Sequence, residues 1–239
     1  LPPPQYSWTY PLAMVVESLR EFEDEHPPSK GRTNYYFIDL FALNQHKAAE
    51  EVGTTPEEGP FNAALAKARH GALMVLDGRA EPMWRIWCLY EVSRAREFNQ
   101  AFRLIADDGD VANAGASTLE EISASLLKLR AYSANASRES DKDAIHYRIL
   151  DPHLKSQASS FEKFTRYKYQ LNESWFEEFD AHVCSLIGTP MLRAGLRAGS
   201  EAVCTRAVGM GAEATVADLE TMTQRLGADL KAEVETRFG

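Results

Sequence analysis

The sequence predicts an α/β fold, a flavodoxin-like open parallel sheet with a helical C-terminal extension. Two apolar, β-rich runs, residues 35–41 and 72–76, are each followed by a helical pattern, and a third run, 102–105, follows the second of these helices. A strand of a parallel sheet is covered on both faces and therefore reads as a nearly continuous hydrophobic run. Strands that alternate with helices form parallel sheets through right-handed crossovers.

Helical spacing of apolar residues and local stop signals predict the remaining elements. We expect helices from Pro11 to the Pro-rich segment 26–31, over 61–69, over 87–98, over 141–150 and along an apolar stripe from Val216 to Val234. Capping boxes at 117–120 and 174–177 predict two further helix starts. The Gly-Thr-Pro sequence at 188–190 predicts a break. We therefore divide the chain into an α/β domain, residues 1–190, and a helical extension, residues 191–239.

Composition excludes several classes of protein. The chain has 239 residues, of which 44% are hydrophobic and 26% charged, with a net charge of −9. Nucleic-acid surfaces need clustered Lys and Arg, so we expect no nucleic-acid partner. No window reaches the roughly 18 apolar residues of a membrane span, so we expect no membrane partner. Three cysteines without a CxxC pair, and histidines without metal-ligand spacing, predict no disulfide framework and no metal, as in a cytoplasmic protein.

Four segments occur in a defined order. They are Tyr36-Phe-Ile-Asp39, Phe61-Asn-Ala-Ala-Leu65, Ala72–Leu76 and Trp87-Cys-Leu-Tyr-Glu91. In order and spacing they resemble the TIR domain, most of all its plant-type version. Residues 35–47 resemble in addition the TIR-like domains of uncharacterised algal and protist proteins. The resemblance covers about residues 6–187 and implies the flavodoxin-like sheet. It departs from the family where the first strand belongs, because residues 2–4 are three prolines.

The resemblance implies an activity for one carboxylate. In catalytic TIR domains the glutamate of Trp-Cys-x-x-Glu promotes cleavage of the nicotinamide–ribose bond of NAD, and that position here is Glu91. Departure of nicotinamide leaves positive charge on the ribose, which a carboxylate stabilises as in glycoside hydrolysis. Nicotinamide is already cationic in NAD, so its departure needs no general acid and one carboxylate suffices. NAD is thus the expected substrate, and no cofactor is required. The alternative is that Glu91 is a solvated carboxylate near a helix start.

Two residues are expected beside Glu91. Trp87 lies four positions earlier in the sequence, so both side chains share one helix face and the indole ring would form a wall of the pocket. Asp39 lies inside the apolar run 35–41, where an uncompensated charge is costly. It either faces a ligand crevice at the sheet edge or caps the next turn through its own backbone.

Further candidate binding residues lie on loops. Asn44, Gln45 and His46 would either donate to phosphate or ribose oxygens or satisfy the backbone of their own loop. Ser7 and Trp8 would flank the pocket, although Trp8 could instead pack in the core. Arg85 would either bind a phosphate or pair with Asp77 or Glu81. Cys88, beside a bulky aromatic residue, is expected to be a packed thiol rather than a nucleophile.

Three functions remain open at this point. The first is an enzyme that binds and cleaves NAD. The second is a non-catalytic module that acts by self-association or by binding other protein domains, with residues beyond Met191 as a partner surface. The third is a protein that binds a nucleotide as a signal without hydrolysing it.

Overall fold

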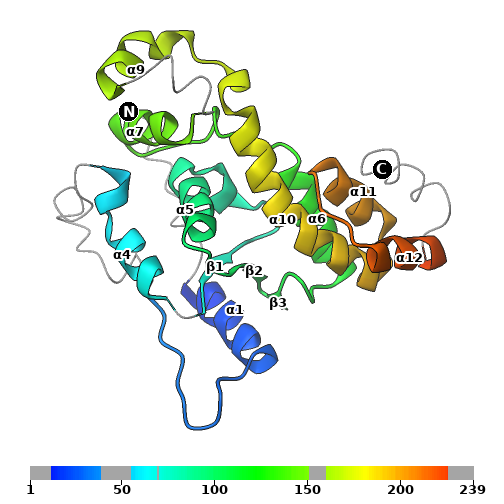
Figure 1. The fold of residues 1–239 in the computed structure, drawn as a ribbon. Coiled ribbons are helices and arrows are strands. Elements are labelled where there is room, and N and C mark those ends of the chain that lie inside the picture. Colours follow the sequence, from blue (N-terminus) through cyan, green and yellow to red (C-terminus); the bar gives the residue numbers. More distant parts are fainter. Residues whose placement is uncertain (1–11, 39–54, 69, 151–159, 226–239) are drawn as a thin grey trace.

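The computed structural model describes residues 12–38, 55–68, 70–150 and 160–225. In this part of the chain, a small three-stranded sheet is surrounded by helices, so the fold is mixed α/β and mostly helical (Figure 1). Strand β1 (Ala72–Val75) pairs in parallel with β2 (Phe102–Ala106), which pairs in antiparallel fashion with β3 (Gly109–Asp110). The predicted parallel pair of strands is confirmed. The third strand is antiparallel and short, and a flavodoxin-like sheet is not seen.

A β–α–β unit forms the centre of the fold. From β1 the chain passes through a short 3-10 turn, η2 (Glu81–Trp84), into α5 (Ile86–Glu97) and returns as β2. The start of β1 depends on Gly71, whose φ is +92° and whose Cβ, if present, would lie 1.9 Å from the carbonyl oxygen of Ala101. Only glycine combines this left-handed backbone with so close an approach of the neighbouring chain.

The other helices lie before and after this unit. Their bounds are α1 Leu12–Glu25, η1 Pro56–Glu58, α4 Pro60–Lys67, α6 Ala116–Leu126, α7 Glu139–Ile149, α9 Phe161–Tyr167, η3 Lys168–Gln170, η4 Glu173–Phe176, α10 Glu177–Ala198, α11 Glu201–Gly209 and α12 Val216–Arg225. In Figure 1, α10 runs the length of the molecule, from the α7–α9 end to the α11–α12 end. The helices expected at 12–25, 61–69, 87–98 and 141–150 are confirmed to within about three residues.

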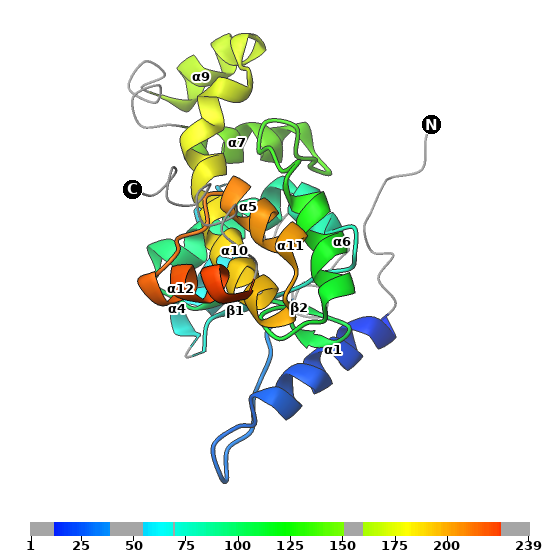
Figure 2. The same ribbon diagram turned by 90° about the vertical axis from the view of Figure 1, so that its right-hand side faces the viewer.

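One hydrophobic core joins the sheet to the C-terminal helices. It contains buried side chains of β1, β2, α5, α6, α10 and α11, among them Leu89, Leu104, Ile122, Met191 and Val203. Helix α10 packs against both α6 and α11, and Figure 2 shows these three helices side by side. The boundary expected after residue 190 lies inside α10, and the core extends across it.

Residues 35–38 do not form the buried strand that their composition predicts. They have no regular secondary structure, and Tyr35, Tyr36 and Phe37 are 91%, 38% and 46% exposed. The side chains of Asn34 and Tyr36 donate to one carboxylate oxygen of Glu23, at 3.2 and 3.0 Å. Within the described residues this segment is held by α1 and by no neighbouring strand. The rest of the expected strand, 39–41, lies outside the described residues.

Two expected helix starts are also wrong in detail. Helix α6 begins at Ala116 with Gly115 at its N-cap, and Asp108 accepts hydrogen bonds there from Gly115 N and Thr118 Oγ1, at 3.3 and 3.0 Å. The second expected capping box lies in η4, where Asn172 Oδ1 accepts from Ser174 N at 3.0 Å. Neither start therefore uses the predicted motif: α6 follows Gly115 without a side-chain cap, and the side chain of Asn172 caps η4.

The expected break at residues 188–190 is absent, because α10 continues through them. Ile187, Met191 and Leu192 are buried on the core side of this stretch. Gly188 allows a close approach there, since an added Cβ would lie 3.1 Å from the carbonyl oxygen of Ala207 on α11. The packing of α10 on α11 thus compensates for the helix hydrogen bond that Pro190 cannot donate.

Candidate functional site

Helix α5 carries the two site residues of the Trp-Cys-x-x-Glu segment. Trp87 lies in its first turn and Glu91 in its second, and both side chains are half-buried. The spacing places them on adjacent positions of one helix face, as expected. Trp87 is held from two directions: its Nε1 donates to Asp141 Oδ2 of α7 at 3.4 Å, and its ring meets Tyr90 edge-on, with centroids 6.1 Å apart. The indole ring is therefore fixed relative to Glu91.

Arg85 lies directly before α5. Its backbone bridges to that of Asn135, where Ile86 N donates to Asn135 O at 2.9 Å and Asn135 N to Trp84 O at 2.7 Å. This two-way contact fixes the entry of the chain into α5. Asp77 and Glu81 are the two carboxylates expected as partners of Arg85. Asp77 Oδ1 accepts a hydrogen bond from Glu81 N at 3.2 Å, and Glu81 Oε1 lies 4.0 Å from Arg79 Nη1.

The remaining site residues predicted from the sequence cannot be placed. Asp39, Asn44, Gln45, His46, Ser7 and Trp8 all lie outside the described residues. The structure therefore brings together Trp87, Glu91 and the backbone of Arg85, and leaves the rest of the expected pocket unplaced.

The carboxyl end of β1, at Gly78, is covered by α6. Ser125 Oγ donates to the carbonyl oxygen of Gly78 at 3.2 Å, and a Cβ on Gly78 would lie 2.4 Å from Glu121 Oε2. Open α/β sheets bind ligands at this edge. At Gly78 that position is filled by the side chains of Glu121 and Ser125.

A polar network on the second half of α5 was missed by the sequence reasoning. We call Glu57, Asn62, Arg94, Glu97 and Arg148 the α5 polar network. Arg94 ion-pairs with Glu97 and donates to Asn62 Oδ1 at 3.0 Å, while Arg148 Nε lies 2.6 Å from Glu57 Oε1. The only sequence signal was the three-residue spacing of Arg94 and Glu97 on one helix. The network ties η1, α4 and α7 to α5.

Tyr90 lies next to this network in the core. Its side chain is 1% exposed, and burial followed by the nearby charge of Glu57 raises the pKa of its hydroxyl. A phenol in this environment stays protonated at neutral pH. Tyr90 therefore supports the ring of Trp87 and offers no base.

The other titratable candidates are structural. His146 is buried between Phe176 and Tyr132, its Nε2 lies 3.2 Å from Ala131 O, and burial lowers its pKa to about 4. Burial raises the pKa of the Cys184 and Cys204 thiols to about 11 and about 12, so neither is a nucleophile at neutral pH. Cys88 packs against the core, as expected. Within the described ranges, no cluster of three or more His, Cys, Asp or Glu side chains fits a metal ion.

Glu91 does not line either of two hollows of the described surface. One, of about 140 Å³, is lined by Val92, Asn99, Gln100, Phe102 and Leu186 at the end of α5. The other, of about 360 Å³, lies between α10 and α12 and is lined by Arg193, Leu196, Arg197, Asp218 and Thr221. The first is smaller than the roughly 300–1,000 Å³ of typical ligand pockets, and the second lies within that range.

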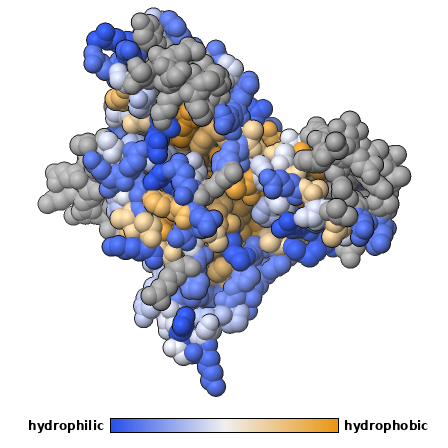
Figure 3. All heavy atoms as spheres, viewed as in Figure 1, coloured by the Kyte–Doolittle hydropathy of each residue, from blue (hydrophilic) through white to orange (hydrophobic). Residues whose placement is uncertain are grey.

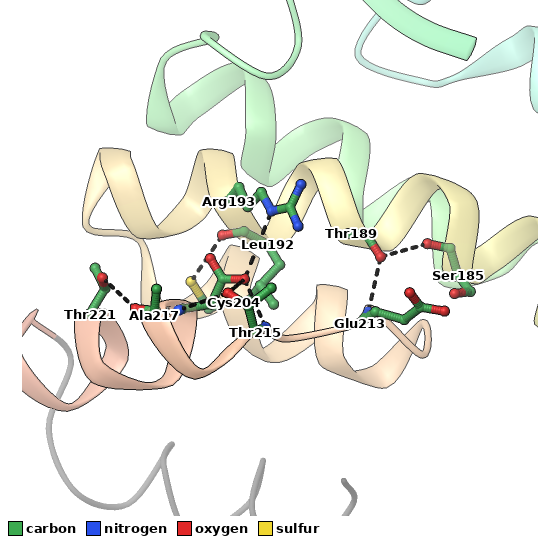
Figure 4. A network of polar contacts seen from close by, with 10 residues as sticks. Ser185, Thr189, Leu192, Arg193, Cys204, Glu213, Thr215, Ala217 and Thr221 are labelled. Carbon is green, nitrogen blue, oxygen red and sulfur yellow. Dashed lines mark hydrogen bonds and ion pairs between the residues drawn. The ribbon is translucent and has the colours of Figure 1, made fainter. Parts of the chain in front are cut away.

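The polar groups of the second hollow serve the packing of α12. Asp218 Oδ2 accepts from Thr215 N and Oγ1, at 2.9 and 2.7 Å, and lies 3.8 Å from Arg193 Nε. Figure 4 shows Thr215 and Arg193 within this network. Thr189 Oγ1 donates to Ser185 O and accepts from Glu213 N in the same view. These bonds cap α12, hold the preceding loop on α10, and give Asp218 and Arg193 of the hollow partners within the protein.

Comparison of the chain with protein-family models, with curated proteins and with solved structures found no match. No helix of the described residues is long and apolar enough to cross a membrane.

Proposed function

We propose that this chain is a TIR-like protein that binds NAD and cleaves its nicotinamide–ribose bond, with Glu91 as the catalytic carboxylate. The observation that carries the proposal is the placing of Trp87 and Glu91 one turn apart on α5, the crossover helix of the parallel β1–α5–β2 unit. The half-buried Glu91 would stabilise positive charge on the ribose as nicotinamide leaves. Trp87, fixed by Asp141, would stack against an aromatic ring of the substrate.

The rest of the pocket would come from Arg85, directly before α5, and from residues outside the described ranges. Asp39 and the loop Asn44–His46 would contact the ribose and phosphates, Ser7 and Trp8 would flank them, and Arg85 would bind a phosphate. Water or an adenine nitrogen of the same dinucleotide would then attack the ribosyl carbon. The reaction needs no metal and no further cofactor in this scheme.

Nicotinamide release from NAD, measured at high protein concentration, tests the proposal. We expect release by the parent chain and a loss of about 100-fold or more with Glu91→Gln, in line with the removal of one charge-stabilising group. The matched control is Glu178→Gln, an exposed glutamate of α10, which should leave the rate unchanged. Equal rates for parent and Glu91→Gln, or no release by either, would overturn the assignment.

A second candidate is a non-catalytic assembly module. One observation favours it: an apolar, β-rich segment is exposed, with Tyr35 at 91% and Phe37 at 46% of full exposure. Apolar side chains exposed together often mark protein contacts. Concentration-dependent association without nicotinamide release would favour this candidate over the enzyme.

A further inference from the structure

One edge of β1 is open in the described part of the chain, where this strand pairs with β2 alone. Ala72 N donates to Ala101 O and Leu76 N to Ile105 O, each at 2.8 Å. Backbone groups alternate in direction along a strand, so those of Leu73 and Val75 point away from β2. Such an edge is a template for another strand.

The same chain exposes a segment suited to that edge. Residues 35–38, Tyr-Tyr-Phe-Ile, have no regular secondary structure and are rich in residues that favour strands. Asn34 and Tyr36 donate to Glu23 of α1, which holds the segment at Tyr36. Tyr35 and Phe37 are 91% and 46% exposed, so their side chains are available for a contact with another strand.

Charge also favours this pair of segments. The chain carries a net charge of −9, so two copies repel each other at long range. Residues 33–38 and 71–76 contain no charged side chain. In Figure 3, apolar atoms gather over the middle of the face that carries β1 and α5, whereas the tip of the N-terminal loop is hydrophilic. Two copies therefore approach each other most easily through these neutral segments.

We propose that residues 35–38 of one copy add as a strand to the open edge of β1 in a second copy, so that the chain associates with itself by strand addition. Each copy carries both halves of the contact, and two such contacts close a symmetric dimer. Main-chain hydrogen bonds to Leu73 and Val75 supply the pairing, and Tyr35 and Phe37 bury apolar area beside β1. This inference rests on the second candidate function, for which it names the contact.

Two single substitutions block the two halves of the contact separately. Val75→Pro removes an N–H that points away from β2 and leaves the β1–β2 bonds in place. Phe37→Pro removes an N–H from the added segment while keeping Tyr36 on Glu23. The matched control for the loop is Thr33→Pro, in the same irregular stretch but before the pairing segment. Thermal melting of each variant checks that the fold is kept.

The measurement is the mass of the parent and variants over a concentration series, by sedimentation velocity or light scattering. We expect the parent and Thr33→Pro to associate, and each of Val75→Pro and Phe37→Pro to weaken association at least ten-fold. An equimolar mixture of the two blocked variants should regain association, because the intact segment of one meets the intact β1 edge of the other.

Each contrary outcome has a distinct meaning. A parent that stays monomeric at every concentration overturns both the contact and the assembly candidate. Association that persists in both blocked variants, or that their mixture does not restore, overturns the contact alone. A monomeric parent whose melting temperature falls equally in Val75→Pro and Phe37→Pro shows that the segment pairs within its own copy, which also overturns the proposal.

Discussion

Two regions of the molecule are attached to the sheet in different ways. One is the helical layer formed by α6, α10 and α11, and the other is the N-terminal arm, residues 12–38. The layer is joined by apolar side chains: Met191, Val203 and Ile122 are each fully buried in the common core. In α1 of the arm, the one buried residue is Ser18. The arm is attached through polar contacts at its end, where Glu25 accepts from Asp110 N at 2.8 Å and His26 Nε2 lies 3.2 Å from Asp110 Oδ2.

Because of this difference, the free energy of global unfolding and the free energy of detaching the arm should depend on different contacts. Close apolar packing is lost only when the whole domain unfolds, whereas a few polar contacts open locally at a lower free energy. The layer should therefore set the free energy of unfolding, and the arm should detach before the core melts. The three predictions below test that division, from the largest expected effect to the smallest.

The largest effect is expected where α10 meets α11. Gly195 allows their close approach, because an added Cβ would lie 2.9 Å from Val203 Cγ1 and 3.0 Å from Cys204 Sγ. Gly195→Leu should lower the free energy of unfolding by about 3 kcal/mol, the upper range for overpacking a core. Urea denaturation measures this. Gly115→Ala, where the added Cβ meets nothing within 4 Å, is the control and should cost much less. Similar losses for both would show that this contact does not determine stability.

A pH effect is expected from His146 in the same core. Its pKa in the folded state is lowered to about 4 by burial, so the unfolded chain binds the proton first as the pH falls. Stability is full above about pH 6.5 and should fall by up to about 3 kcal/mol as the pH drops to about 4. His146→Gln should flatten this part of the stability curve relative to the parent.

The control for this pH profile is His70→Gln, an exposed histidine. Its curve between pH 4 and 6.5 should follow that of the parent. A His146→Gln curve that falls as steeply as the parent's would contradict the buried, neutral state of His146.

The smallest global effect is expected at the arm. The carboxylate of Asp110 lies 3.2 Å from His26 Nε2 and 3.0 Å from Arg103 Nη1. Asp110→Ala should lower the unfolding free energy by about 2 kcal/mol and speed tryptic cleavage after Lys30 and Arg32 by a larger factor. Asp24→Ala, an exposed change on α1, is the control. Cleavage that quickens only in proportion to global unfolding would mean that the arm does not detach by itself.

Much of the central unit could be predicted from the sequence. The strands at 72–75 and 102–106, their parallel pairing and the helix that carries Trp87 and Glu91 follow from local patterns of apolar residues. These patterns are reliable there because a buried strand and an amphipathic helix must show them in order to bury their apolar faces. For the site, the sequence supplied the spacing of Trp87 and Glu91.

The contacts around that site depended on distant residues. Asp141, which holds Trp87, and Arg148, which joins Glu57 and Glu97, come from α7, and no local pattern links them to α5. Residues 188–190 look like a helix break, yet α10 continues because Ile187 and Met191 are buried against its neighbours. Tertiary packing here outweighs local propensity, since it involves many more atoms.

The sequence by itself determined the β1–α5–β2 unit and the place of Glu91 on its helix, because hydrophobic periodicity is a local property of the chain. Only the tertiary structure decided which side chains surround Trp87, that α6 covers Gly78, and that residues 35–38 are exposed instead of forming a buried strand. Those outcomes depend on which partner each segment finds, and a strand former without a neighbouring strand has its backbone hydrogen-bonding groups still to satisfy.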